Sequence, residues 1–215
     1  MGAKGHLMIW DTLMNIPAGQ MMAFIAGGLV LNFAPGQDVF FASACGIQGG
    51  PRAGAWAGLG VGLGVLMHVT LATIGLGAVV AAHPEALRAI KYAGAAYLLW
   101  LAWKSWRAGD IDPTARGSVR VWNIIRRGFL SNALNPKPVL FMLAFLPQFT
   151  NVAWGPIWQQ ILGLGLIFAF TGTLVTIGYG VVGGVAGHVI GKRLGLVNKI
   201  AAVMFAGLAI RLVAK

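Results

Sequence analysis

The sequence predicts an all-α integral membrane protein with six transmembrane helices in two inverted three-helix repeats, of which helices one and four are broken. Two properties of the chain carry this prediction. Of its 215 residues, 58% are hydrophobic and only 10% are charged, whereas about a quarter are charged in soluble proteins. The apolar residues also form long segments, two of which are interrupted by proline at matching places.

Six apolar segments are long enough to span a bilayer, which takes about 20 helical residues. They cover residues 22–47, 53–82, 86–106, 128–149, 157–185 and 194–213. We expect residues 1–20 to form an N-terminal extension, either an interfacial helix with Trp10 at the headgroups or an over-extended gene start. Residues 21–106 and 128–215 are the expected repeats, and residues 107–127 a basic linker.

The two halves of the chain carry similar motifs at similar positions. Pro35 and Gly36 interrupt the first segment, and Pro136 interrupts the fourth. The stretch that begins at Thr73 in the second segment resembles the stretch that begins at Thr176 in the fifth. Because each half has three helices, the second half must insert upside down. Inverted repeats that each contain a broken helix are typical of transporters.

The net charge of +11 indicates orientation rather than nucleic-acid binding, because the basic residues lie between apolar segments. Cytoplasmic loops are enriched in Lys and Arg. The first, third and fifth loops hold most of these residues: Arg52, Lys104, Arg107, Arg116, Arg120, Arg126, Arg127, Lys192, Arg193 and Lys199. The sequence therefore predicts a multi-pass inner-membrane protein with both termini outside and the long basic loop in the cytoplasm.

Asp38 and Lys137 are the full charges well inside the apolar segments, one beside each break. A charge at the bilayer centre costs roughly 2.5–3.5 kcal/mol on insertion scales, so we expect both to face the interior and to approach each other. They form either a buried ion pair that fixes helix packing, or a substrate or proton site between the halves. An amino acid, which carries an ammonium and a carboxylate, suits such a site.

Other polar residues of these segments are candidates for the same cavity. Four residues flank the breaks and are suited to bond the freed backbone groups: Asn32, Gln37, Asn132 and Asn135. His68 is either a packing residue or a proton carrier, and Tyr97 either lines the cavity or anchors the membrane interface. Glycines that recur every four residues favour close helix packing: Gly54, Gly58 and Gly62.

Several of these motifs together resemble the lysine exporter (LysE/RhtB) family of amino-acid and metabolite efflux proteins. They are the stretches 34–38, 49–58, 64–68, 91–98, 127–137 and 145–149. The family pattern usually reads Pro-Gly-Pro-Asp, and this chain has Gln37 at the second proline. The resemblance implies export driven by the proton gradient, and it leaves the solute open.

The expected function is secondary-active, proton-coupled export of amino acids or related metabolites, with Asp38 or His68 as the coupling site. The chain offers no phosphate-binding loop, zinc motif or catalytic nucleophile, so neither an enzyme nor a cofactor nor a metal is expected. A homodimer is compatible with the sequence. The alternatives are efflux of a metal ion or a lactone, a membrane-embedded enzyme, and a non-transporting scaffold, although Lys137 would repel a cation.

Overall fold

The computed structural model describes the following residues: 9–34, 36–82, 92, 96, 99–100, 102–103, 106–107, 120–191, 199, 202–203, 206–207 and 209–210. This part of the chain is helical and has no strands. Its elements are α1 (Ile9–Met14), α2 (Ala18–Phe33), α3 (Gln37–Ala82), α5 (Val121–Ala133), α6 (Pro136–Phe145), two short 3₁₀ helices η1 (Leu146–Phe149) and η2 (Val152–Trp154), and α7 (Ile157–Gly191). The all-α prediction is confirmed for this part.

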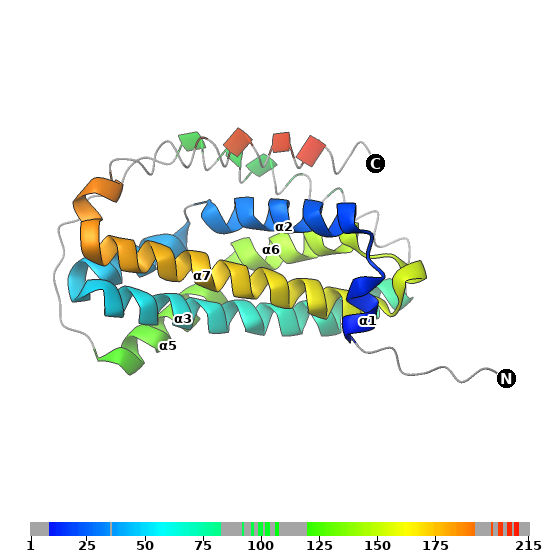
Figure 1. Ribbon diagram of the computed structural model, residues 1–215, viewed down its shortest axis with the longest axis horizontal. Coiled ribbons are helices and arrows are strands. Elements are labelled where there is room, and N and C mark those ends of the chain that lie inside the picture. Colours follow the sequence, from blue (N-terminus) through cyan, green and yellow to red (C-terminus); the bar gives the residue numbers. More distant parts are fainter. Residues whose placement is uncertain are drawn as a thin grey trace.

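Most of these helices lie along the long axis of a single bundle (Figure 1). Helices α3 and α7 run for most of its length and form the most extensive interface, followed by α3 with α5. Two described stretches are long and apolar enough to cross a membrane, Gln37–Gly75 and Ile157–Val185, and α2 is a shorter apolar helix. Most of the predicted third and sixth segments lies outside the described residues.

Helix α3 consists of two helices that meet at a kink. Gly50 has φ 80° and ψ 179°, and Pro51 follows it. Glycine tolerates a positive φ, and proline has no N–H for the helical hydrogen bond. The loop expected between the first and second segments is therefore reduced to a sharp turn, with Arg52 exposed beside it.

The chain leaves helical geometry at both predicted breaks. Helix α2 ends at Phe33 and α3 begins at Gln37, with Ala34 extended between them (ψ 114°). Helix α5 ends at Ala133 and α6 begins at Pro136. Proline is favoured at the first position of a helix, because the N–H that it lacks has no helical partner there.

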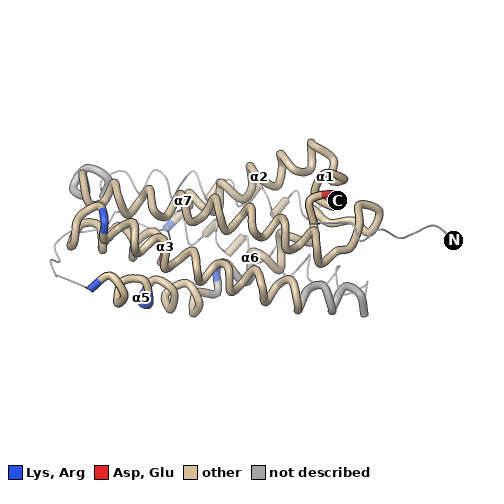
Figure 2. Tube along the Cα trace, turned by 60° about the horizontal axis from the view of Figure 1, so that its bottom comes forward, with Lys and Arg blue, Asp and Glu red and all other residues tan. Residues whose placement is uncertain are grey.

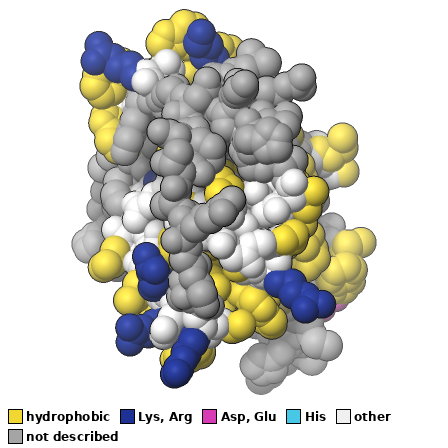
Figure 3. All heavy atoms as spheres, turned by 90° about the vertical axis from the view of Figure 1, so that its left-hand side faces the viewer, with side chains coloured by type: hydrophobic (Ala, Val, Ile, Leu, Met, Phe, Trp, Pro, Cys, Tyr) yellow, Lys and Arg dark blue, Asp and Glu magenta, His cyan; other side chains and the backbone are white. Residues whose placement is uncertain are grey.

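Figure 2 shows a group of basic residues at one end of the bundle, where α5 begins and α3 kinks, and other basic residues farther along it. Arg52, Arg120, Arg126 and Arg127 are exposed there, and Figure 3 shows Lys and Arg side chains around this end. The bundle sides instead expose large apolar residues: Leu63, Leu71, Ile74, Phe170, Leu174, Val182 and Val185. The end with Arg52 is called the arginine end from here on.

The opposite end is covered by the N-terminal segment. Thr12 of α1 is fully buried, and its hydroxyl donates to Gln159 Oε1 at the start of α7 (2.6 Å). Asn15 Nδ2 donates to the Trp154 carbonyl (3.3 Å). Trp10 remains exposed. The segment thus packs on the bundle through α1, beside η1 and η2 (Figure 1). We call this the N-terminal end.

Glycines bring α3 and α7 into backbone contact, as expected for Gly54, Gly58 and Gly62. A Cβ on Gly54 would lie 2.7 Å from the Gly180 Cα, and one on Gly58 would lie 2.7 Å from the Ile177 nitrogen. Farther along, Gly62 faces Thr173. The α7 numbers fall as the α3 numbers rise, so the two helices cross in antiparallel sense at their narrowest contact.

Gly54→Ala is therefore expected to destabilise the bundle by about 1–3 kcal/mol, because the added methyl group meets backbone that cannot rotate away. Gly178→Ala is the matched control, since a Cβ there has no atom within 4 Å and alanine favours helix over glycine. Thermal unfolding of the purified variants checks this prediction. Equal midpoints for the two variants would contradict it.

Candidate functional site

The two helix interruptions lie next to each other. The charged side chain beside each one forms hydrogen bonds with groups at the other. Asp38, in the first turn of α3, accepts hydrogen bonds at Oδ2 from Asn132 Nδ2 (2.9 Å) and Asn135 Nδ2 (3.2 Å). Lys137 of α6 donates from Nζ to the Ala34 carbonyl, between α2 and α3 (3.0 Å). Each interruption thus holds the charge of the other one.

The cap of α6 explains how Asn135 reaches Asp38. Asn135 is the N-cap residue, and its Oδ1 accepts from the Lys137 backbone N–H (3.0 Å). This bond satisfies one of the donors that every helix start leaves open. It also fixes the amide so that Nδ2 points to Asp38. A single buried asparagine therefore joins the start of α6 to the carboxylate.

Pro136 links His68 to the same group of residues. Since Pro136 has no N–H, the Asn132 carbonyl lacks its usual helical donor four residues on. That carbonyl instead accepts from the Asn135 N–H (2.9 Å) and contacts His68 Nε2 at 3.0 Å. A carbonyl only accepts, so Nε2 carries the hydrogen in this contact. His68 is 4% exposed.

Three buried polar atoms of this network have no hydrogen-bond partner among the described residues: Asp38 Oδ1, His68 Nδ1 and Asn132 Oδ1. Buried polar atoms in native proteins are nearly always bonded. Asn132 and His68 are both almost fully buried. The network thus contains acceptor atoms for which the described part of the chain supplies no donor, which is typical of a site that takes a proton, a water molecule or a solute.

A cavity of about 40 Å³ lies between the two interruptions. Its polar lining comes from Asp38, Lys137, Asn132, Asn32 and Thr176, and its apolar lining includes Leu31, Val39, Val61, Val65 and Phe168. Such a volume holds about three water molecules. The charged groups are in place, but the site has too little room for an amino acid, and we call this arrangement the closed form.

The carbonyl groups at the end of α2 are bonded from the other half of the chain. Tyr179 of α7 donates its hydroxyl to the Phe33 carbonyl (3.0 Å), next to the Ala34 carbonyl that accepts from Lys137. A missing Cβ matters here, because one on Gly36 would lie 3.1 Å from Lys137 Nζ. Glycine at this position leaves room for the ammonium.

The predicted site residues differ in how they lie relative to the cavity. Asp38, Lys137, Gly36 and Asn132 line the cavity, while His68 and Asn135 reach it through their bonds to Asn132 and Asp38. Gln37 is exposed and donates to Ser131, so it joins the two interruptions outside the cavity. Pro35 and Tyr97 lie outside the described residues, and Pro136 begins α6.

Tyr179 and Thr176 are site residues that the sequence did not predict, and Asn32 was expected only to flank a break. Asn32 Nδ2 donates to Thr171 Oγ1 on α7 (3.1 Å), and Thr176 is buried at the cavity wall. One signal was present in the sequence. Both α7 residues belong to the stretch 176–183, which recurs in the second segment.

Fold and site together define an all-helical membrane protein with a buried polar site between two helix interruptions. The chain matches the family model of the LysE type translocators over residues 29–215. It belongs to this family, and the resemblance drawn from the sequence is confirmed. It is a membrane transporter of the LysE family.

Curated relatives have similar sequences over most of their length. The chain is 33% identical to a homoserine/homoserine lactone efflux protein of Salmonella typhi, over 73% of this chain and 77% of the relative. It is 32% identical to an uncharacterized membrane protein of Vibrio cholerae, over 74% and 78%. A leucine efflux protein of Klebsiella pneumoniae is 30% identical, over 61% and 63%. No solved structure matches the chain.

Proposed function

We propose that this chain is a secondary-active exporter of amino acids or close relatives, coupled to protons, with the solute bound between Asp38 and Lys137. The observation that carries the proposal is the reciprocal arrangement of the two interruptions. A carboxylate from one and an ammonium from the other line a single cavity. Two relatives are named as efflux proteins for homoserine or its lactone and for leucine.

The charges suit the two ends of an amino acid. Asp38 Oδ1 is the carboxylate oxygen without a donor among the described residues of the site, so it is the atom for a solute ammonium. Lys137 Nζ bonds a neutral carbonyl in the closed form, and a solute carboxylate forms a stronger, charge-assisted bond to it. The starts of α3 and α6 also lie at this cavity. Helix N-termini stabilise negative charge, so they favour the solute carboxylate as well.

The remaining lining favours a neutral solute side chain. Leu31, Val39, Val61, Val65 and Phe168 supply apolar contact. Asp38 is the one carboxylate among the described residues of the lining. If Asp38 binds the α-ammonium, that lining has no second carboxylate for a basic side chain. We therefore place neutral amino acids ahead of lysine or arginine as solutes.

Coupling follows if the solute and a proton compete for Asp38. A protonated carboxyl group no longer attracts the solute ammonium, so protonation on the outer side releases the solute. Loss of that proton on the inner side restores the site. His68 is the second candidate for the coupling group, because its Nδ1 is buried without a hydrogen-bond partner among the described residues, next to the same network.

The proposed arrangement in the membrane is six spanning helices in two inverted halves. The α2–α3 and α5–α6 interruptions are then the breaks of spanning helices one and four. Support comes from the arginine end, where Arg52, Arg120, Arg126 and Arg127 are exposed together as the positive-inside rule requires of a cytoplasmic face. In this proposal the termini lie outside the inner membrane, and the two halves rock about the cavity.

Purified protein in liposomes tests the proposed function. A panel of labelled neutral, basic and acidic amino acids is loaded inside, and their flux is followed with and without a pH gradient. We expect neutral amino acids to move fastest, and only the gradient to drive them uphill. Absence of flux for every amino acid, from protein shown to be folded, would contradict the proposal.

His68→Gln separates the two candidates for the coupling group. Glutamine keeps an N–H that is able to bond the Asn132 carbonyl, and it does not titrate. If Asp38 is the coupling group, the variant retains export within about threefold and keeps its dependence on the pH gradient, since only a neutral packing bond is replaced. The measurement is uphill flux in liposomes. Loss of the gradient dependence would assign coupling to His68.

A further inference from the structure

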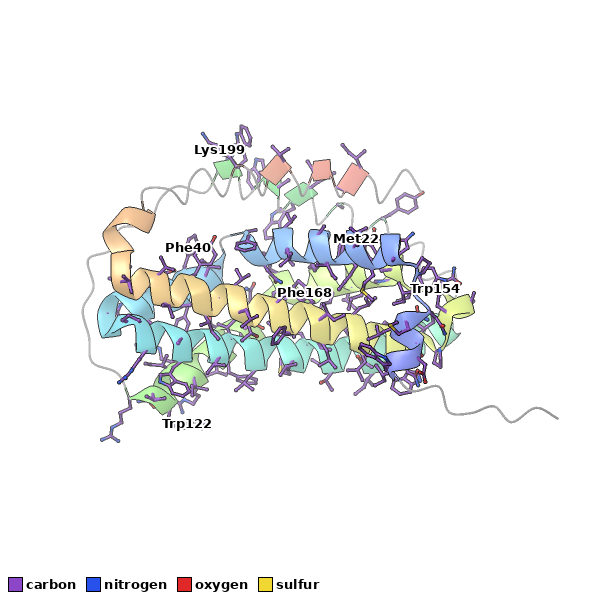
Figure 4. The ribbon with its side chains drawn as sticks, in the orientation of Figure 1. Met22, Phe40, Trp122, Trp154, Phe168 and Lys199 are labelled. Atoms are coloured by element: carbon purple, nitrogen blue, oxygen red, sulfur yellow. The ribbon has the colours of Figure 1, made fainter. Side chains whose placement is uncertain are left out.

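Five buried phenylalanines form a continuous stack between the cavity and the N-terminal end of the bundle. Phe168 lines the cavity and lies in the first half of α7, on the side of its start (Figure 4). Its ring is 5.5 Å from the Phe141 ring between centroids, and Phe141 is 4.5 Å from Phe145. The rest of the stack, which we call the phenylalanine cluster, consists of Phe24 and Phe149.

The cluster joins elements from both proposed halves. Phe24 belongs to α2, whereas Phe141 and Phe145 belong to α6 and Phe149 to η1. The Phe24 ring lies 5.7 Å from Phe145 and 5.5 Å from Phe149. Each of the five residues is at most 5% exposed. A first-half side chain is thus inserted among second-half rings along the line from the cavity to η1.

Helix α2 is shaped to receive one of these rings. A Cβ on Gly27 would lie 3.0 Å from Phe145 Cε2 and closer still to its Cζ. Glycine at this position therefore forms the groove in which the Phe145 ring lies. Rings packed edge to face and offset against one another exclude water without a polar contact. Separation of α2 from α6 would therefore open this water-excluding contact along its whole length.

We propose that the phenylalanine cluster is the gate of the transport pathway on the face opposite the arginine end, closed in this structure. The inference rests on the proposed function, which supplies the solute and requires a pathway for it through the bundle. A solute that leaves the cavity toward η1 must pass the interface of α2 with α6, which these rings fill. Opening requires Phe24 and Phe145 to separate.

Cysteine accessibility tests the gate without any solute. Cys45 is first replaced by Ala, and Val65, at the cavity wall, is then replaced by Cys as the only thiol. A small membrane-impermeant methanethiosulfonate is applied to intact cells and, separately, to inside-out vesicles. The labelling rate is compared for the closed background, for Phe145→Ala, and for Phe170→Ala, whose ring is 66% exposed on α7 and serves as the matched control.

Phe145→Ala is expected to raise the labelling rate roughly tenfold or more from one face only, the face opposite the arginine end, because the closed form loses packing that the open form does not use. Phe170→Ala leaves the rate unchanged. If the Phe145→Ala protein does not fold, Phe145→Leu replaces it, with a smaller rise expected. An unchanged rate in folded protein, a rise from both faces, or an equal rise in Phe170→Ala overturns the proposal.

The same experiment tests the proposed gate independently of the proposed solute. Labelling of Val65→Cys depends on access to the cavity and not on which solute is exported. A one-sided rise in a protein that exports no amino acid would retain the gate and reject the proposed solute. Amino-acid export by a protein whose labelling ignores Phe145→Ala would retain the solute and reject the gate.

Discussion

Asp38→Asn is expected to abolish uphill, proton-driven export. Asparagine keeps an oxygen to accept from Asn132 and Asn135, so the start of α3 keeps its bonds. It neither attracts a solute ammonium nor binds a proton. Removal of one partner from a buried charged contact costs about 2–5 kcal/mol, which corresponds to a loss of roughly 30-fold to several thousandfold in solute binding.

The measurement for Asp38→Asn is flux into or out of liposomes with an imposed pH gradient. Asp11→Asn is the matched control, because Asp11 is exposed on α1, far along the chain from the cavity residues. Protein amount and thermal stability are compared in parallel. A variant that is folded and still concentrates its solute would show that Asp38 serves only the packing of α3 against α5 and α6.

Lys137→Gln is expected to lose recognition of the solute carboxylate. In the closed form Nζ bonds the Ala34 carbonyl, and glutamine is able to supply a neutral N–H to the same atom. It has no charge for a carboxylate. We therefore expect export of a free amino acid to fall roughly 30-fold or more, by the same cost of an unpaired buried charge, and export of the corresponding amide or lactone to fall much less.

Competition between an amino acid and its amide in liposomes measures this difference. Lys137→Arg keeps the charge and is expected to recover part of the activity, limited by its larger planar head group. Lys199→Gln is the control, since Lys199 is exposed in the described part of the chain. Equal losses for the amino acid and the amide would remove Lys137 from carboxylate recognition and leave it a structural role.

Much of the helical framework and of the charged site was predictable from the sequence, for a physical reason. Proline in a helix interior removes a backbone hydrogen bond, and a charge in an apolar segment must be buried with partners. These rules are local, so they find Pro136, Asp38 and Lys137 without knowledge of packing. The polar partners Asn132 and Asn135 were candidates because they lie within a few residues of the same break.

The rest depends on the register between helices far apart in the chain. Tyr179 reaches the Phe33 carbonyl across the packing of α7 against α2. The phenylalanine cluster combines residues of α2, α6, η1 and α7 that look like ordinary apolar positions in the sequence. The Gly50–Pro51 kink was expected as a loop, because proline and glycine mark an interruption without fixing its angle.

Equilibrium binding of the best-exported amino acid to purified protein tests the central claim most directly. The wild-type protein, Asp38→Asn and Lys137→Gln are titrated by calorimetry under conditions where all three have similar unfolding midpoints. The site between the two interruptions predicts that each variant binds at least about 30-fold more weakly than wild type. Wild-type affinity in both variants would place the solute elsewhere and contradict the account.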